Sequence, residues 1–314
     1  MQIRNLHRSL IVLCLLFFGP IARLAFGVTT NLVPVADTFL SENWATNNMG
    51  GLMFFNAGTT QNHTKNRGLL KFDPADHLPP GVRILSADLI LEVVGVPPET
   101  PFSDFHLHRL LKDWGEGNKT TPTNCTSCAG QGALATTNEA TWVYRFAFTT
   151  NTWTAPGADA TNDYAVAISS SQTIYDVGNS PYTFASTSQM VADVQLWHDD
   201  PQTNFGWILI SAEETVIYTA RRFGSREDTN HLPQLVIEYV VPPLIDHVER
   251  NGDEFKLFFT AQAGQTYAVE YSDVLASTNT WSTFTNISAP SETTNLVITN
   301  FTSVGERFYR LSTQ

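Results

Sequence analysis

Alternation of apolar and polar side chains with a period of two is the feature that most restricts how this chain can fold. Every second residue is apolar in residues 85–93, and the same pattern recurs in residues 255–259 and 267–271. Successive side chains of a β-strand point to opposite faces, so this pattern indicates strands with one buried face. A short apolar run in residues 205–210 is typical of a central strand. The chain is therefore expected to form many short strands.

One segment carries a helical pattern instead. Ser186 and Gln189 form a capping box, and the apolar residues between Met190 and Trp197 fall on a single helical face. We expect this stripe to pack into the core. One short helix among many strands predicts an all-β fold, and more specifically a jelly-roll-like β-sandwich.

Two domains are predicted, with the boundary at Pro242 and Pro243. Residues 28–241 hold the helix and most of the strands, and they form the jelly-roll-like domain. Residues 242–314 begin a new alternating pattern in a segment long enough for only a small core. We expect a small β-sandwich of the immunoglobulin or fibronectin type there.

Residues 1–27 are predicted to be a secretory signal. They begin with basic side chains, continue as an apolar run in residues 10–18, and end on small residues before Val28. A membrane anchor is the alternative, but the apolar run is short for a bilayer and Arg23 interrupts it. The sequence has no second apolar run of this kind. We therefore expect a secreted, extracellular protein with no membrane span.

The charge of the chain excludes one class of partner. Only 15% of the residues are charged, and the net charge of −12 becomes −15 once the signal, with three arginines and no acidic residue, is removed. Nucleic-acid binding requires a basic footprint, so nucleic acid is excluded as a partner. A low charged fraction with many Thr, Asn and Ser residues is typical of secreted β-rich proteins.

We expect the protein to be a monomer.

Two cysteines, Cys125 and Cys128, remain after the signal. In an exported protein a close pair favours a disulfide, which here would staple one loop. A redox role would need a following helix, and a zinc site would need about four ligands. The sequence around the pair offers neither, so we predict the disulfide.

Several segments, taken in order, resemble a known family. They are ADTFL (36–40), RGLLKFD (67–73), ILSADL (84–89), DWGEG (113–117), ATW (140–142), WTAPGAD (153–159), ARRFGSRE (220–227) and PQL (233–235). This order resembles the bacterial DNRLRE-type domains, which are grouped with carbohydrate-binding module family 96. Only the Arg226-Glu227 ending of the family's namesake hexapeptide is present.

The resemblance covers roughly residues 30–241. It implies a jelly-roll sandwich, secretion and carbohydrate binding, with alginate-like acidic polysaccharides as one ligand class. The end of the chain is similar to small C-terminal β domains of exported bacterial proteins, a similarity that implies no chemistry.

Aromatic and basic side chains are the candidates for contact with a sugar. Trp44 lies in a loop, where its ring can stack on a sugar, and filling the core is the alternative. Trp114 and Trp142 are assigned to the fold. Four cations are suited to bind the carboxylates of a uronate polymer: Arg221, Arg222, Arg226 and Lys119.

The acidity of the chain opposes this basic site, because a net charge of −15 repels a polyanion at long range. A local patch or a bridging cation would have to overcome the repulsion. A structural ion pair between Arg226 and Glu227, holding the loop after a strand, is the alternative function for these two residues.

Oxygen ligands for a structural Ca²⁺ are available in Asn31, Asp37 and Asp73. His106 and His108 lie two residues apart on a predicted strand, so their imidazoles share a face. A metal there would need a third ligand from another strand, and we assign the pair a role without metal.

No catalytic residue is predicted. The adjacent carboxylates at 199–200 and 213–214 would point to opposite faces of a strand, which makes a poor acid/base pair, so we assign them to a helix end and a turn. The nucleophile, zinc-protease and phosphate-loop motifs are absent from the sequence.

These observations lead to one expected function and two alternatives. The first is a secreted, noncatalytic polysaccharide-binding protein, with uronate-rich glycans as a ligand class. A structural or adhesive surface protein without sugar binding is the first alternative. A polysaccharide lyase or hydrolase is the second.

Overall fold

The computed structural model describes residues 27–123, 130–274, 281–301 and 307–313. The predicted signal, apart from its last residue, and both cysteines of the predicted disulfide lie outside these ranges. In the described part of the chain, no helix is long and apolar enough to cross a bilayer.

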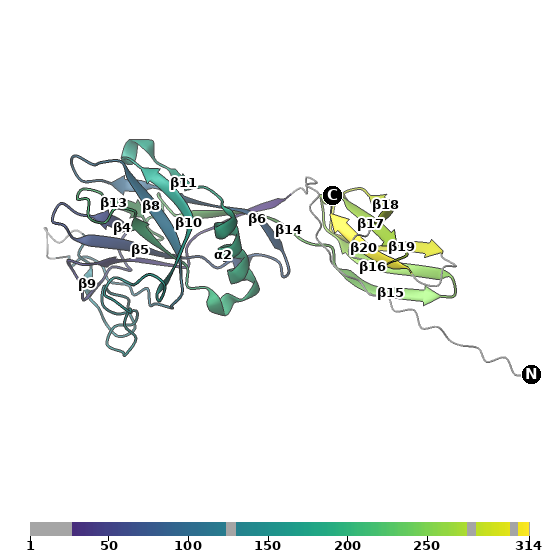
Figure 1. Cartoon of the computed structure of the whole chain (residues 1–314), viewed down its shortest axis with the longest axis horizontal. Helices are drawn as coiled ribbons and strands as arrows, with labels where there is room; N and C mark the ends of the chain where they lie inside the picture. Colours follow the sequence, from purple (N-terminus) through teal and green to yellow (C-terminus); the bar gives the residue numbers. More distant parts are fainter. Residues whose placement is uncertain (1–26, 124–129, 275–280, 302–306, 314) are drawn as a thin grey trace, which may run out of the picture. The chain divides into compact units, whose positions relative to one another are not determined.

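Strands dominate the chain, as the alternating pattern predicted. They account for 45% of the residues against 8% in helices, so the predicted all-β sandwich class is confirmed. The chain divides between Tyr239 and Val240 into two compact units, shown in Figure 1. The boundary expected from the sequence, Pro242, lies just beyond this point.

The N-terminal unit is built on two main sheets. The four-stranded sheet has the order β1 (Val28–Leu32), β14 (Gln234–Val240), β6 (Arg83–Leu91) and β11 (Tyr182–Phe184). The eight-stranded sheet runs β10 (Tyr164–Ile174), β8 (Ser103–Leu110), β12 (Trp207–Ser211), β5 (Lys65–Lys71), β4 (Phe54–Thr59), β13 (Arg221–Gly224) and β7 (Val93–Gly95), with β2 (Ala36–Ser41) paired to β5. The orders β1-β14-β6-β11 and β5-β12-β8-β10 are those of a jelly roll.

Short elements complete this unit. They are a small sheet of β3 (Asn47–Asn48) and β9 (Ala133–Leu134), the α-helices α1 (Pro74–His77) and α2 (Ser188–Asp199), and the 3₁₀ helices η1 (Val177–Asn179) and η2 (Pro201–Thr203).

Helix α2 confirms the predicted apolar stripe and corrects its start. Met190, Val194 and Trp197 are fully buried. The N-cap is Thr187, whose Oγ1 accepts the N–H of Met190, and not Ser186. The predicted cap was one residue early, because Ser and Thr both suit this position and two of them are adjacent here.

Aromatic rings fill the core of this unit. Phe223 of β13 stacks on Phe55 with ring centroids 5.3 Å apart, and it meets Phe105 of β8 edge-on at 5.9 Å. Of the predicted alternating row, Ala87, Leu89, Leu91 and Val93 are buried. Leu85 departs from it, being only partly buried while Ile84 is buried instead.

A second core lies over the other face of the eight-stranded sheet. Ile208 and Ile210 of β12 point away from Trp207, and Trp114, Trp142 and Trp153, from described segments between β8 and β10, pack against them. The indole N–H groups of Trp114 and Trp153 donate to backbone carbonyls at 2.9 Å. Trp114 and Trp142 therefore maintain the fold, as predicted.

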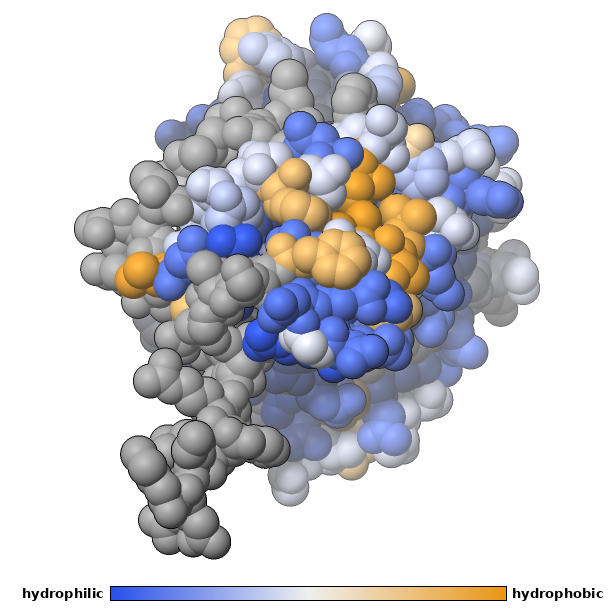
Figure 2. Space-filling view, turned by 90° about the vertical axis from the view of Figure 1, so that its right-hand side faces the viewer, coloured by the Kyte–Doolittle hydropathy of each residue, from blue (hydrophilic) through white to orange (hydrophobic). Residues whose placement is uncertain are grey.

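The C-terminal unit is a small sandwich of two three-stranded sheets. One sheet has the order β15 (Ile245–Asn251), β16 (Glu254–Ala261) and β19 (Thr294–Phe301), and the other β18 (Ser282–Ile287), β17 (Tyr267–Ser272) and β20 (Phe308–Thr313). Its core includes Phe255 stacked on Tyr309 at 4.4 Å. Figure 2 shows apolar side chains (orange) gathered on one face of this unit among hydrophilic ones.

Candidate functional site

Trp44 is partly exposed, as a sugar-stacking residue would be. It lies in the turn between β2 and β3, where 36% of its surface remains accessible. The turn is held by the backbone, because the Trp44 N–H donates to the Ser41 carbonyl and the Trp44 carbonyl accepts from Asn47. Trp44 therefore stays a candidate for ligand contact.

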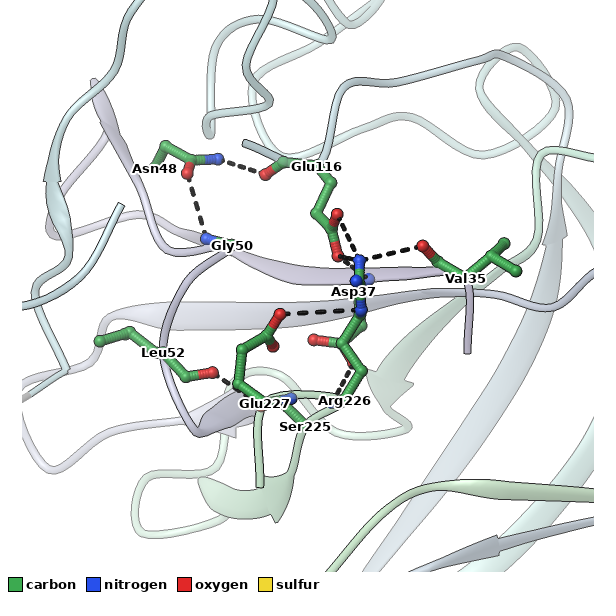
Figure 3. Close-up of polar contacts among 9 residues, drawn as sticks. All are labelled: Val35, Asp37, Asn48, Gly50, Leu52, Glu116, Ser225, Arg226 and Glu227. Atoms are coloured by element: carbon green, nitrogen blue, oxygen red, sulfur yellow. Dashed lines mark hydrogen bonds and ion pairs between the residues drawn. The ribbon is translucent and has the colours of Figure 1, made fainter. Parts of the chain in front are cut away.

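Arg226 is bonded to its own chain. Its Nη1 donates to both carboxylate oxygens of Glu116, at 2.8 and 2.9 Å, and to the Val35 carbonyl at 3.0 Å. The Arg226 N–H donates to Asp37 Oδ2 at 2.7 Å, and the Asp37 N–H donates back to Glu116 at 2.8 Å. We call the trio Asp37, Glu116 and Arg226 the clasp (Figure 3). It joins three segments that lie far apart in the sequence. The predicted pair with Glu227 is present but longer, with Arg226 Nε 3.7 Å from Glu227 Oε1, so the structural alternative is favoured for Arg226 with Glu116 as its main partner.

The sequence around Glu116 folds this way because of a glycine. Gly117 has a φ of +76°, and a Cβ at this position would lie 2.3 Å from Asn48 Oδ1. The Asn48 side chain donates to the Glu116 carbonyl at 2.7 Å and accepts from Gly50 (Figure 3). The positive φ of Gly117 thus lets the backbone pass close to Asn48, whose side chain fixes the chain at Glu116, and the Glu116 carboxylate reaches Arg226.

Burial is the main influence on the pKa values of the two carboxyl groups in the clasp. It raises the pKa of the Asp37 carboxyl well above its usual value, although the Arg226 N–H acts in the opposite direction. Burial also raises the pKa of Glu116, against the hydrogen bond from Asp37 and the charge of Arg226. Both acids therefore hold a proton more strongly in the folded chain than in water.

Lys119 is also paired within the chain. Its Nζ lies 3.1 Å from Glu139 Oε1, and both side chains are largely covered. Glu139 in turn accepts from the N–H of Thr136 at 2.6 Å. This ion pair competes with any ligand carboxylate for the Lys119 ammonium.

Arg221 corrects a prediction. It is completely buried, so its guanidinium does not meet a surface ligand. The guanidinium donates to the carbonyls of six residues: Pro101, Ile174, Tyr175, Tyr218, Thr219 and Ala220. Burial lowers the pKa of Arg221 to about 10. The adjacent Arg222 points to the opposite face, as successive strand residues do.

Arg222 keeps its charge available. Its guanidinium carbon lies 4.3 Å above the ring of Phe54, and it makes no hydrogen bond or ion pair with another described residue. Burial lowers the pKa of Arg222. Of the four predicted cations, this is the one whose donors are not taken up by the described part of the chain.

The predicted Ca²⁺ ligands are spread over separate elements. Asn31 lies on β1, and Asp37 on β2 accepts from Arg226. Asp73 caps α1 by accepting from the N–H of Asp76 at 3.3 Å. The structure does not form the proposed site, because each of the two aspartates already has a structural partner.

His106 and His108 share a face of β8, with ring centroids 6.0 Å apart. The Nδ1 of His108 lies 3.0 Å from the Ala165 carbonyl, and burial lowers the pKa of this imidazole. Within the described ranges, the structure has no group of three or more His, Cys, Asp or Glu side chains placed to hold a metal.

A hollow of about 350 Å³ lies at one end of three neighbouring strands of the eight-stranded sheet, β10, β8 and β12. Its volume falls in the range of about 300–1,000 Å³ that is usual for ligand pockets. Residues from the three strands and the segment after β12 line it: Phe102, Ser103, Asp104, Thr173, Ser211, Ala212, Glu213, Val216 and Thr219. The sequence-based reasoning assigned none of them to a site.

An exposed aromatic residue stands at this hollow. The Phe102 side chain is 75% exposed, and Tyr175 meets it edge-on with centroids 4.2 Å apart. Thr173 Oγ1 donates to Asp104 Oδ1, and the Ala212 N–H donates to the Asp104 carbonyl at 2.8 Å. The arrangement offers an apolar ring beside hydroxyl and carboxylate groups.

Arg221 lies behind the wall of this hollow and holds its backbone in place. The carbonyls that it binds belong to Pro101, Ile174 and Thr219, among others, and these adjoin or form the wall. The buried guanidinium thus ties together three segments of the wall, while its planar fork limits the directions in which they can lie. Arg221 is a positioning residue and not a ligand contact.

Glu213 is the one lining residue that the sequence had singled out, and only as part of a turn. Glu213 and Glu214 were assigned to a solvated turn, and the two do face different ways. Glu214 binds Arg67 through both carboxylate oxygens, at 2.6 and 2.8 Å, whereas Glu213 lines the hollow. Phe102 had no such signal, because exposure of an aromatic side chain next to prolines depends on the tertiary structure.

Comparisons with known proteins add no relative. No family model matches the chain, and no curated protein matches it either. The resemblance to DNRLRE-type domains therefore stays a prediction.

Proposed function

We propose that this chain is an exported, noncatalytic glycan-binding protein and that the hollow beside Phe102 receives the sugar. The observation that carries the proposal is the Phe102 ring, 75% exposed and backed by Tyr175, next to a lining of hydroxyls and carboxylates. A sugar has the complementary surface, because its CH groups can cover an aromatic face while its hydroxyls form hydrogen bonds.

Three further observations support this proposal. The sequence resembles carbohydrate-binding domains, the first 27 residues have the pattern of an export signal, and the unit has a jelly-roll strand order. Arg221 supports it as well. The Arg221 guanidinium is buried although desolvation of its charge is unfavourable, and it holds the loop carbonyls in place. The wall is thus already ordered before a ligand binds.

A glycan array probed with the full chain, followed by calorimetric titration of the best ligand, tests the proposal. We expect Phe102→Ala to weaken binding at least about tenfold, since a stacked aromatic side chain contributes about 1.4 kcal/mol or more at a binding hot spot. Phe148→Ala is the matched control, because this phenylalanine is 66% exposed and does not line the hollow. Its affinity should equal that of the unmodified chain.

Two results would count against the proposal. Failure of the folded chain to bind any glycan would remove the function and favour the structural or adhesive alternative. Release of new reducing ends, or of unsaturated uronate absorbance, from a bound polysaccharide would show that the protein is an enzyme.

A further inference from the structure

We infer that the hollow beside Phe102 takes uncharged sugars and rejects uronates, an inference that rests on the proposed glycan-binding function. The charge of the lining is the first argument. Asp104 and Glu213 contribute carboxylates, and none of the nine lining residues is a lysine, arginine or histidine. A uronate in this hollow would bring a third negative charge to two fixed ones and find no cation in the lining.

The hydrogen-bonding groups of the lining are the second argument. An ionised carboxylate can only accept hydrogen bonds, so it is suited to the hydroxyls of a sugar. Asp104 already accepts from Thr173 Oγ1, which fixes the orientation of its carboxylate. The Glu213 carboxylate makes no hydrogen bond or ion pair with another described residue. Both carboxylates can therefore accept further hydrogen bonds. An uncharged, hydroxyl-rich ligand supplies the donors.

Ser211 adds a polar residue to the wall of the hollow. Its Oγ is buried and has no hydrogen-bond partner among the described residues.

Arg222, the predicted cation that makes no hydrogen bond or ion pair with another described residue, lies elsewhere. Arg222 stands over Phe54 on the opposite face of β13 from Arg221, and it does not line the hollow. A uronate would therefore be directed to Arg222 and an uncharged sugar to Phe102. The two ligand classes can be separated by which variant abolishes binding.

Affinity gel electrophoresis of the full chain tests the inference, with galactomannan, xyloglucan, alginate and polygalacturonate as the probes. We expect retardation by at least one of the two neutral polymers, lost in Phe102→Ala and unchanged in Arg222→Gln. The double variant Asp104→Asn, Glu213→Gln should lower the preference for neutral over uronate oligosaccharides about tenfold, because it removes the repulsion and weakens the acceptors. Glu249→Gln, in the C-terminal unit, is the control for loss of an acidic charge.

Each other outcome overturns either the inference about uncharged sugars, the location of the site or the proposed function. Retardation only by alginate or polygalacturonate, lost in Arg222→Gln, overturns the inference and leaves glycan binding intact. Retardation by a neutral polymer that survives both Phe102→Ala and the double variant shows that the hollow is not the site. No retardation by any polymer, together with a silent glycan array, overturns the proposed function itself.

Discussion

The clasp and the hollow are built from the same kinds of residue and behave in opposite ways. Each combines carboxylates with an arginine, on strands of the N-terminal unit or in the segments between them. In the clasp, Arg226, Glu116 and Asp37 bind one another, so their charged and polar groups are paired within the chain. At the hollow, the Arg221 guanidinium donates to backbone carbonyls behind the wall and not to a carboxylate. Asp104 and Glu213 therefore have no cation among the lining residues. The comparison shows that charge density alone does not make a group available: the Glu116 carboxylate is bound by Arg226, whereas the Glu213 carboxylate makes no hydrogen bond or ion pair with another described residue.

Replacing Arg221 should produce the largest loss of stability. Arg221→Met leaves six buried or partly buried carbonyls without their donor, and we expect the free energy of unfolding to fall by about 3–5 kcal/mol. Urea denaturation measures the change. Arg222→Met is the matched control and should cost about 1 kcal/mol or less, since it removes a cation–π contact. Equal losses in the two variants would contradict the role given to Arg221.

Breaking the clasp should cost less. Arg226→Met removes the bonds to Glu116 and Val35, and their partial exposure to solvent reduces the expected loss to about 1–2 kcal/mol. Glycan affinity should not change, because the clasp does not line the hollow. A variant that unfolds at the same urea concentration as the unmodified chain would show that the clasp is dispensable. A parallel loss of affinity would show that clasp and hollow are coupled.

The clasp should also make stability depend on pH. The folded pKa of Asp37 lies above the unfolded value, so its contribution is complete below about pH 4 and is lost as the pH rises through the folded pKa. The free energy of unfolding of Asp37→Asn should therefore fall less than that of the unmodified chain between acid and neutral pH. Asp253→Asn, in an exposed turn of the C-terminal unit, is the control for the loss of an acidic side chain. Identical profiles for Asp37→Asn and the unmodified chain would exclude the titration of this carboxyl.

Phe102→Ala should have the smallest effect on stability and sharpens the comparison most. The side chain is 75% exposed, so the free energy of unfolding should change by less than about 0.5 kcal/mol. Thermal or urea unfolding measures this change beside the loss of glycan affinity. Substantial destabilisation would mean that Phe102 belongs to the fold and that its exposure is no sign of a ligand.

Much of the fold follows from local pattern, as β6 and α2 show. The buried row of β6 is visible as alternation, and the buried stripe of α2 is visible as helical spacing with a cap nearby. The tryptophans of the DWGEG and ATW segments were assigned to the fold and are buried. Local pattern also placed the boundary near Pro242, because an alternating segment that resumes after two prolines indicates a new core.

The candidate site depended on information that local pattern lacks. Neighbouring strand residues point to opposite faces, but the sequence does not say which of Arg221 and Arg222 faces inward. That choice follows from the register of β13 against β4 and β7. The hollow likewise combines side chains from Phe102, Thr173 and Ser211, which the jelly-roll topology brings together.

The chain's residues in order were enough to assign an all-β class, one buried helical stripe and a net negative charge. Each of these depends on local periodicity or on composition, which do not change when the chain folds. The partner of each charge was decided by folding alone. Arg226 met Glu116 across 110 residues of sequence and Arg221 met Pro101 across 120, because strand pairing sets which distant segments touch. The same long-range pairing left Asp104, Glu213 and Phe102 facing a hollow.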